Sequence, residues 1–496
     1  MSGTSTALPV RVGLREERIA VDDPFATFVA LRSRFGEREV ALFESLGGPD
    51  IDNRAALIQV GRLVEISVRD RRVELDGDAA ISAHVRERLV AAGLVGEEGD
   101  ALPIGAGVTV WDVARTCEAA FALEDAASDR FDFGFSVVLG YEVAAEIENL
   151  RFEHPGSDDL PDVVLTAYAS TVSFDLVHAT ATVIATESPL WGSRYDEVAD
   201  ALRDAAAAPV VLPADPAAPG TDVSDSLGEA EYLEMAEVAL EHIRAGDIYQ
   251  VQLGHEIRVR GARDDLAVYA RMRRDNPSPY MAFIPVGEYA VLSASPELHV
   301  RVSGDELLMR PIAGTARRGA DEEQNARNRE WLLADDKEAA EHVMLVDLCR
   351  NDLGRVAVTG SVTVDQLMTV ETYSHVFHLV STVSATLRSG RDVWDVVCAT
   401  FPAGTMTGAP KIRAIQIIEE LENSRRGFYA GVFGLVGVGG FANLALSIRT
   451  VVAGPDGYSL RASAGVVIDS SPQSEWNETL AKMGAPARAT TGRDLL

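Results

Sequence analysis

The sequence predicts an α+β fold, because helix-like and strand-like segments follow each other irregularly rather than in the regular βαβ rhythm of a doubly wound sheet. Three observations lead to this prediction. Before residue 205, β-branched runs such as "ALIQVGRLVEISV" and "DVVLTAYASTVSFDLVHATATVIAT" indicate strands. Helical patches such as "DPFATFVALRSRF" lie between them. After residue 225 an amphipathic helix runs directly into a strand.

The composition excludes several classes of protein. With 496 residues and 47% hydrophobic content, the chain can bury one large core or two modest ones. No apolar run approaches the roughly 18 residues of a membrane span, and the N-terminus lacks the order of a signal peptide, so we expect a cytoplasmic protein without a membrane partner. The net charge of −31 argues against nucleic acid as a partner. An anionic small substrate would need a local metal or a cluster of Arg and Lys.

The three cysteines, Cys117, Cys349 and Cys398, form neither a disulfide framework nor a zinc-binding spacing. We interpret them as small buried side chains rather than nucleophiles.

A segment rich in Ala, Pro and Asp divides the chain. Residues 205–225, "AAAAPVVLPADPAAPGTDVSD", are expected to be a linker or surface loop between an N-terminal region, 1–204, and a catalytic region, 226–496. The helix that follows is expected to be capped by Ser226 and to end at Gly246. In the next strand, "DIYQVQL", Val251 and Leu253 share one face and Gln250 and Gln252 the other.

Two pairs of carboxylates have helical spacing. Glu338 and Glu341 lie one turn apart in "EAAEHVMLVDL", and Glu475 and Glu478 repeat this spacing in "SEWNET", where a helix is expected to follow an apolar strand. A single pair is ordinarily a solvated helix end. Four carboxylates that converge from two helices would bind a hard divalent cation, most plausibly Mg²⁺.

Other residues have both a structural and a functional interpretation. Gly314-Thr315 and Gly404-Thr405 fit ordinary turns or a close approach of backbone to a ligand. His378, in a strand-like segment, fits a hydrogen-bonded core residue or a catalyst. Arg449 stands in an otherwise apolar strand, where a guanidinium needs a partner, so Arg449 and Tyr429 are candidates to bind a carboxylate.

These segments, in this order, resemble the chorismate-utilising enzyme family, and within it the component I proteins of anthranilate synthase. The motifs span residues from about 230 to 482, with a weaker match at "ALFES" and "DIDN". They are "GDIYQVQL", "NPSPYMAF", "SASPE", "RPIAGT", "EAAEHVMLVDLCRNDLGRV", "YSHVFHLVS", "FPAGTMTGAPKIRA", "RRGFYAGVFG", "SIRT" and "SSPQSEWNET". The resemblance implies an anthranilate synthase-like fold with two facing antiparallel sheets flanked by helices.

The resemblance also implies roles for individual residues. Glu341 and Glu478 look like ligands of Mg²⁺, supported by Glu338 and Glu475, and the metal would hold the ring carboxylate of chorismate. The enolpyruvyl carboxylate would be bound by Tyr429, Arg449, Ala464, Gly465 and Lys482. Glu297 resembles the general acid that helps the C4 hydroxyl leave, and Gly314, Thr315 and Thr405 would contact the ring.

Two positions indicate the nucleophile. Members of the family that add water at C2 have a Lys base at the position of Gln250, and an amide cannot deprotonate water, whereas ammonia needs no such base. Members that make 4-amino-4-deoxychorismate have a nucleophilic Lys at the position of Ala313. Both substitutions point to amination at C2, which gives 2-amino-2-deoxyisochorismate, also called 2-amino-4-deoxychorismate.

The sequence leaves open whether pyruvate is then eliminated to give anthranilate. His378 matches the residue that assists elimination. Arg461 and Ser463 stand where anthranilate synthases have Gln and Gly, and "GHE" at residues 254–256 replaces a Ser-x-Arg pattern. The expected function is amination without elimination, in secondary metabolism. The alternatives are a tryptophan-insensitive anthranilate synthase component I and a catalytically silent regulatory homologue.

Regulation and nitrogen supply complete the expectations. The feedback site keeps Glu44 and Ser45, but the family's aromatic residues at Ala282 and Leu435 are missing, so tryptophan should bind weakly and not inhibit. No cysteine stands in a Gly-x-Cys-x-Gly nucleophile turn. Ammonia is therefore expected from glutamine through a separate amidotransferase subunit.

Overall fold

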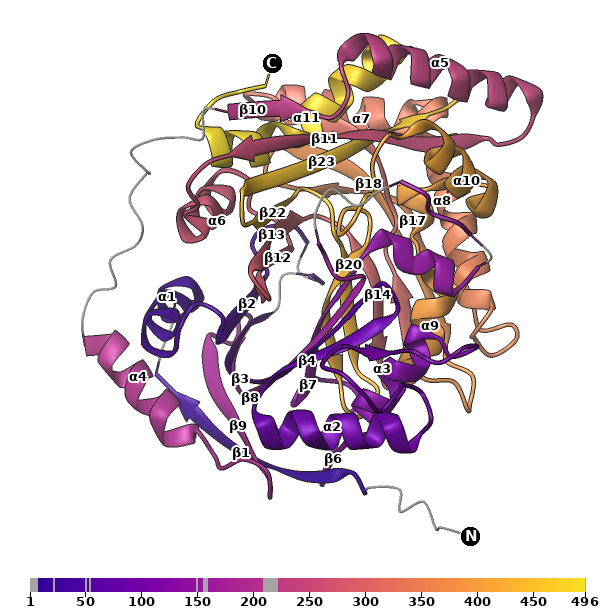
Figure 1. Ribbon diagram of the computed structural model, residues 1–496. Coiled ribbons are helices and arrows are strands. Elements are labelled where there is room, and N and C mark those ends of the chain that lie inside the picture. The colour runs from indigo at the N-terminus through magenta and orange to yellow at the C-terminus, as the bar shows by residue number, and fades with distance from the viewer. Residues whose placement is uncertain are drawn as a thin grey trace.

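The computed structural model describes residues 8–20, 23–49, 51–52, 55–148, 150–154, 159–207 and 222–495 (Figure 1). Up to residue 207 the elements are β1 (Val10–Ile19), α1 (Pro24–Phe35), β2 (Val40–Glu44), β3 (Ala55–Arg69), β4 (Arg72–Gly77), α2 (Ala79–Ala91), β5 (Leu102–Pro103), α3 (Val110–Glu118), β6 (Phe121–Leu123), β7 (Gly134–Leu139), the 3₁₀ helix η1 (Tyr141–Glu146), β8 (Val163–Asp175), β9 (Thr180–Glu187) and α4 (Tyr195–Ala207).

From residue 222 the elements are β10 (Asp222–Asp225), α5 (Glu229–Ala245), β11 (Gln250–Arg260), α6 (Asp265–Asp275), β12 (Tyr280–Val286), β13 (Tyr289–Ser295), β14 (Leu298–Ser303), β15 (Glu306–Met309), β16 (Ile312–Arg317), α7 (Glu322–Ala334), α8 (Asp336–Gly354), β17 (Thr363–Thr372), β18 (Val376–Thr386), α9 (Val393–Thr400), η2 (Gly404–Met406), β19 (Gly408–Ala409), α10 (Lys411–Leu421), β20 (Val432–Gly437), β21 (Ala442–Leu446), β22 (Thr450–Gly454), β23 (Gly457–Val466) and α11 (Pro472–Thr491). Among these described helices, none is both long and apolar enough to cross a membrane.

Most of the strands form one continuous series of antiparallel pairs. The series runs β11–β23–β22–β13–β12–β2–β3 and continues as β8–β7–β20–β21–β14–β15–β18, with β16 and β17 both paired to β18. Helices α5 and α11 cover the outer side of β11 and β23, at the top of Figure 1, and α7 and α8 contact β16 and β18. The α+β prediction is confirmed.

The two regions expected on either side of the linker share their sheets. Strand β2 pairs with β12, and β7 pairs with β20, so strands from both regions alternate in the series. The expected linker is shorter than 205–225, because residues 205–207 are the end of α4 and Asp222–Asp225 form β10, paired to β11. Residues 208–221 lie outside the described residues.

Local sequence explains how the helices next to the sheets begin and end. Helix α8 starts at Asp335, whose carboxylate accepts from the backbone N–H groups of Lys337 and Glu338. Helix α5 is not capped by Ser226. Gly228 is its N-cap, and Ser226 Oγ accepts instead from the N–H of Glu256 on β11. The predicted left-handed Gly246 ends α5 with φ of 85°.

The cysteines agree with their interpretation as packing residues. Cys117 and Cys349 are buried, Cys398 is half-buried, and all three are free. Burial raises the pKa of Cys117 and of Cys398 to about 12, so these thiols are not nucleophiles at neutral pH.

A buried cluster of charges joins four segments beneath the inner face of β11 and β23. The Glu422 carboxylate, at the end of α10, accepts from Arg426 Nη2 at 2.7 Å, from Arg461 Nη2 at 2.7 Å and from the N–H of Gly254 at 2.9 Å. Arg426 also donates to the carbonyls of Met406 and Gln252. Burial opposes the charge of Glu422, but the two guanidinium groups outweigh burial and lower the pKa of Glu422.

We predict that Glu422→Gln destabilises the protein by about 3–5 kcal/mol, because it leaves two buried guanidinium groups without their counter-ion. The pKa of Glu422 is lowered on folding, so its contribution is present above the unfolded value of about 4.3 and is lost as the pH falls through the folded value. Chemical denaturation at pH 7 and at acidic pH measures both effects.

Glu420→Gln is the matched control, because Glu420 lies on the same helix in an exposed pair with Arg413. Its expected cost is at most about 1 kcal/mol. Equal losses for the two variants would contradict the role assigned to the cluster.

Candidate active site

A cavity of about 710 Å³ lies between the two halves of the strand series. Gln252 and Ser463 face it from β11 and β23, and Thr315 and His378 face it from β16 and β18. Helices α8 and α11 contribute the carboxylate pairs from one side. The volume is that of a site for a small organic ligand.

One end of the cavity is strongly acidic. Glu338, Glu341, Glu475 and Glu478 all line it, as the sequence predicted from the spacing of the two pairs. Burial raises the pKa of Glu341, and the charge of Glu478 raises it further, while an amide hydrogen bond from Gln250 lowers it. Burial and a neighbouring carboxylate likewise raise the pKa of Glu338 and of Glu475. The four side chains therefore concentrate negative charge at one place, which a bound cation would relieve.

The donor set of this acidic end fits Mg²⁺, because it consists of carboxylate oxygens only. Within the described part of the chain, no three acidic, His or Cys side chains are already close enough together to hold a metal ion. Glu478 is bound to Lys482 Nζ at 2.6 Å and Glu341 to Gln250 Nε2 at 2.5 Å. A metal would therefore draw the carboxylates together and displace these contacts.

Another part of the cavity presents cations, one of which, Lys482, reaches the acidic end through its ion pair with Glu478. The Arg449 guanidinium makes no hydrogen bond or ion pair within the described residues, and burial lowers its pKa. Its backbone has φ of 49°, an uncommon conformation for a side chain of this size. Lys482 Nζ donates to the carbonyl of Ser463 at 2.9 Å. Burial opposes the charge of Lys482, but Glu478 outweighs burial and raises the pKa. This end is built to receive an anion.

Ser463 connects two polar side chains at the cationic end. Its hydroxyl donates to Gln252 Oε1 at 3.0 Å, so the 2.7 Å contact with Tyr429 has the Tyr429 hydroxyl as donor. Burial raises the pKa of Tyr429, which keeps that hydroxyl protonated. The Tyr429 hydroxyl, which could otherwise donate to a ligand carboxylate, thus donates its hydrogen bond to Ser463. The sequence identified the substitution at residue 463 but not this network, because Gln252 and Tyr429 are 177 positions apart.

Glu297 follows β13 and lines the cavity, within electrostatic reach of Lys482 and Arg449. Burial raises the pKa of Glu297 to about 8, although Thr405, the backbone at Ile312, Lys482 and Arg449 act to lower it. The side chain is therefore mostly protonated at neutral pH and suited to donate a proton.

His378 lies on β18 and faces the cavity. Its Nδ1 is 3.0 Å from the carbonyl of Gly314, which can only accept, so Nδ1 carries the proton. Nε2 is buried and has no hydrogen bond within the described residues. Burial lowers the pKa of His378 to about 4, and the charge of Arg449 lowers it further. The imidazole is neutral at pH 7 and offers an unprotonated nitrogen.

Two glycines lie where a side chain would collide with the site. Gly314 has φ of 63°, and a Cβ there would lie 3.1 Å from a carboxylate oxygen of Glu338. A Cβ at Gly465 would lie 2.8 Å from Gln250 Nε2 and 2.9 Å from Gln252 Nε2. A Cβ at Gly404, the other glycine interpreted in the sequence as a turn or a ligand approach, would lie 2.6 Å from Leu348 Cδ1. Close approach of Gly314 and Gly404 to a ligand stays a prediction. Thr315 and Thr405 line the cavity.

Two predicted site residues do not line the cavity. The Gln250 amide is held beside Glu341, next to Gly465. Ala464 is fully buried, because side chains alternate along β23 and residues 461, 463 and 465 occupy its inner face. Tyr373 was missed, although it lines the cavity and its ring meets that of His378 at 5.1 Å. It precedes β18 in a turn, where strand periodicity gives no signal.

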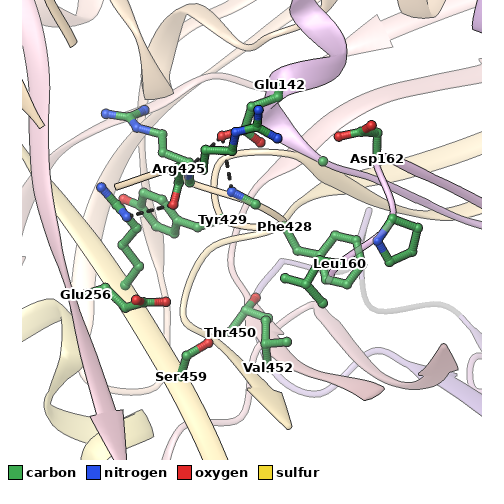
Figure 2. A pocket seen from close by; sticks show the side chains of 15 residues that line it. Glu142, Leu160, Asp162, Glu256, Arg425, Phe428, Tyr429, Thr450, Val452 and Ser459 are labelled. Carbon is green, nitrogen blue, oxygen red and sulfur yellow. Dashed lines mark hydrogen bonds between the residues drawn. The ribbon is translucent and has the colours of Figure 1, made fainter. Parts of the chain in front are cut away.

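A second pocket of about 60 Å³ lies behind Tyr429 and Arg461. Figure 2 shows Glu142, Asp162, Glu256 and Arg425 around it. Glu256 and Arg461 are directly opposite each other on β11 and β23, so two departures from the family pattern are cross-strand neighbours. Arg461 lines both this pocket and the large cavity, and its guanidinium donates to Glu422, Ser424 and the carbonyl of Arg425. Ser463 is the substitution whose side chain contacts Tyr429.

The residues of the expected feedback site lie apart from this cavity. Ala282 is paired with Phe43, and both pack with Leu435 in one apolar cluster. The buried Glu44 accepts from the Tyr269 hydroxyl at 2.8 Å and from Arg273 Nε at 2.9 Å, and Ser45 is half-buried. Burial raises the pKa of Glu44, while Arg273 acts to lower it. Insensitivity to tryptophan stays a prediction.

Comparison with known proteins gives the same assignment as the motifs. The family model of the chorismate binding enzyme matches residues 94–488. The chain belongs to this family. It is 44% identical over 493 residues to a 2-amino-4-deoxychorismate synthase of Streptomyces globisporus, covering 98% of each chain. It is 49% identical over 259 residues to anthranilate synthase component 1 of Aquifex aeolicus, covering 52% of each.

Among solved structures, anthranilate synthase component I from Streptococcus pneumoniae TIGR4 aligns with a TM-score of 0.72 at 28% identity, covering 89% of this chain and 93% of that one. The expected anthranilate synthase-like fold is confirmed.

We predict that Glu341→Gln and Glu478→Gln each weaken Mg²⁺ binding by more than about 100-fold. Loss of a residue that only supports a metal ligand costs up to about 100-fold in affinity, so a larger loss indicates a direct ligand. Calorimetry with Mg²⁺ in the presence of chorismate measures the affinity, and chorismate consumption should fall in parallel. Asp347→Asn is the control, because Asp347 is exposed on the same helix and paired with Arg350. Unchanged Mg²⁺ affinity in both Glu variants would exclude the acidic end as the metal site.

Proposed function

We propose that this chain is a Mg²⁺-dependent synthase that aminates chorismate at C2 and releases 2-amino-2-deoxyisochorismate (2-amino-4-deoxychorismate). The observation that carries the proposal is the content of the cavity, which a protonated Glu297 lines together with the four carboxylates and the unpaired Arg449. Chorismate has a carboxylate at each end and a hydroxyl between them. The identity to a 2-amino-4-deoxychorismate synthase over 98% of both chains supports the same product.

The charges orient the substrate. Arg449, Lys482 and Tyr429 would bind the enolpyruvyl carboxylate, because they are the cationic and donor groups of one end. Glu341 and Glu478, with Glu338 and Glu475, would hold Mg²⁺ at the other end. The metal supplies the positive charge that the ring carboxylate needs there and polarises it.

Glu297 acts as the general acid. The nitrogen lone pair forms a bond to C2, the two ring double bonds each shift by one position, and the C4–O bond breaks as Glu297 protonates the departing hydroxyl. The products are water, a Glu297 carboxylate and an ammonium group on C2, which later loses one proton. The raised pKa of Glu297 keeps this acid mostly protonated at neutral pH.

The nucleophile is ammonia rather than water or a lysine. Gln250, held against Glu341, cannot serve as a base, and Ala313 provides no amine. Unprotonated ammonia is scarce at neutral pH, so a separate glutamine amidotransferase is the proposed source. The three free cysteines fit a reducing compartment, and we place the protein in the cytoplasm.

Ser463 is the proposed reason that the enolpyruvyl group is retained. Because the Tyr429 hydroxyl donates to Ser463, it is less available to the enolpyruvyl carboxylate. Elimination requires the C2–H and C3–O bonds to be aligned with a base, and a differently held carboxylate changes that alignment. The low pKa of His378 also makes it a weak base.

An anthranilate synthase is the second candidate. The unprotonated Nε2 of His378 faces the cavity and is available to accept the C2 proton, which favours elimination. A silent regulatory homologue is disfavoured, because the acid, the carboxylates and the cations all face one cavity.

Product analysis distinguishes these functions. Incubated with chorismate, Mg²⁺ and an ammonium salt at mildly alkaline pH, the protein should give a non-fluorescent amine that keeps its enolpyruvyl group, as mass spectrometry would show. Stoichiometric anthranilate and pyruvate would instead establish the second candidate, and no consumption of chorismate would establish a silent homologue.

Ser463→Gly should raise the share of anthranilate at least about tenfold, which corresponds to about 1.4 kcal/mol in the partition between release and elimination. Ser459→Gly is the control, since Ser459 lies on the same strand but does not line the large cavity. An unchanged product ratio in Ser463→Gly would remove Ser463 from the explanation.

A further inference from the structure

A small chamber lies next to Glu297 and Thr405. Its volume of about 10 Å³ is at the lower limit of the space that holds one water molecule. Glu297 and Thr405 line both this chamber and the large cavity, so they form the wall between the two. His299 and Cys349 line the chamber on the far side.

The hydrogen bonds of His299 fix its tautomer. The Thr400 hydroxyl donates to the carbonyl of Val396 at 2.9 Å, so the 3.0 Å contact between Thr400 Oγ1 and His299 Nε2 has the imidazole as donor. Nδ1 of His299 is therefore an acceptor. Burial lowers the pKa of His299 to about 3, and the charge of Lys411 lowers it further, so the ring is neutral.

Three buried polar atoms from the lining of this chamber have no hydrogen bond within the described residues: His299 Nδ1, Thr405 Oγ1 and Arg310 Nε. His299 is 1% exposed, and its Nδ1 makes no hydrogen bond within the described residues. Thr405 Oγ1 is also buried without a hydrogen bond of acceptable geometry within them. Buried polar atoms without partners are rare, and a buried water commonly satisfies such groups when two to four of them surround it.

We propose that one water in this chamber joins His299 to Glu297, and that His299 is a positioning residue for the catalytic acid. The water donates one O–H to His299 Nδ1 and the other to the inner oxygen of Glu297, and it accepts from the Thr405 hydroxyl. The proton of Glu297 is then left on the oxygen that faces the large cavity.

The water also aids the chemical step. When Glu297 gives its proton to the departing hydroxyl, the second O–H of the water donates to the new carboxylate, where a hydrogen bond is stronger than to the neutral acid. Because His299 Nδ1 can only accept, it takes one O–H of the water and leaves the second O–H to donate to Glu297. This inference rests on the proposed role of Glu297 as general acid, and holds for either final product.

The other charged groups around Glu297 either are paired with counter-ions or lower its pKa, whereas burial raises it. Lys482 and Arg449 lower its pKa from the large cavity. Arg310, at the chamber, is paired with Asp52 and Glu371. Behind Cys349, Lys411 is paired with Asp352 at 2.8 Å. Among the residues that the structure describes, His299 has the one imidazole that lines the chamber. A substitution of His299 therefore tests the contribution of this imidazole alone.

The test is the pH profile of chorismate consumption by His299→Leu, expressed per concentration of unprotonated ammonia. Without the hydrogen bond that the water donates to Glu297, the pKa of Glu297 is higher. The alkaline limb of the profile, where activity falls as Glu297 deprotonates, should therefore move up by about one pH unit. The value of kcat should fall about tenfold, with KM changed less than twofold. His299→Asn keeps an acceptor near the position of Nδ1 and should restore part of both effects.

His84→Leu is the control, since His84 lies on α2 and bonds only the carbonyl of Ala120. A His299→Leu profile that keeps the wild-type limb, whatever its kcat, would overturn the proposal.

A crystal structure of the wild-type protein tests the same proposal if His299→Leu does not fold. Density for a water within hydrogen-bond distance of His299 Nδ1 and Glu297 is expected, and a chamber filled by side chains would refute the inference. Neither result depends on the product. Failure of the amination proposal, seen in product analysis, therefore remains distinguishable from failure of this one.

Discussion

The unpaired guanidinium of Arg449 is the constraint on which the site depends. A buried cation without a counter-ion is unfavourable, and here the backbone is also held in a conformation that large side chains rarely adopt. The surrounding sheets maintain this arrangement, and a substrate carboxylate relieves it. A cation at one end and four carboxylates at the other then leave one orientation for a dicarboxylate substrate, with its hydroxyl near Glu297.

The rest of the structure supports this separation of charge. The Glu422 cluster ties the end of α10 to β11, β23 and the segment before Tyr429, so the groups proposed to bind the anion rest on a network of buried charge pairs. Glu297 is buried deeply enough to remain protonated, and His378 deeply enough to remain neutral. Burial therefore keeps Glu297 protonated and the His378 imidazole uncharged in the same cavity.

Much of this organisation could be predicted from the sequence. Helical spacing identified both carboxylate pairs, and strand alternation placed Gln250 and Gln252 on one face of their strand, because these patterns are local. Contacts between distant segments could not be predicted. The tie of Tyr429 to Ser463, the sharing of Glu422 between two arginines and the chamber at His299 each depend on how strands pair in the folded chain. Ser226 was a plausible helix cap whose hydroxyl a neighbouring strand uses instead.

Calorimetry of chorismate binding by Arg449→Met, together with its thermal unfolding, tests the central claim most directly. If Arg449 is kept unpaired for the substrate, the variant should bind chorismate in the presence of Mg²⁺ at least about 30-fold more weakly, as expected when one partner of a buried charge pair is removed. Its unfolding temperature without ligand should be unchanged or higher, because an uncompensated buried charge is gone. Wild-type affinity for chorismate, or a large loss of stability, would contradict the account.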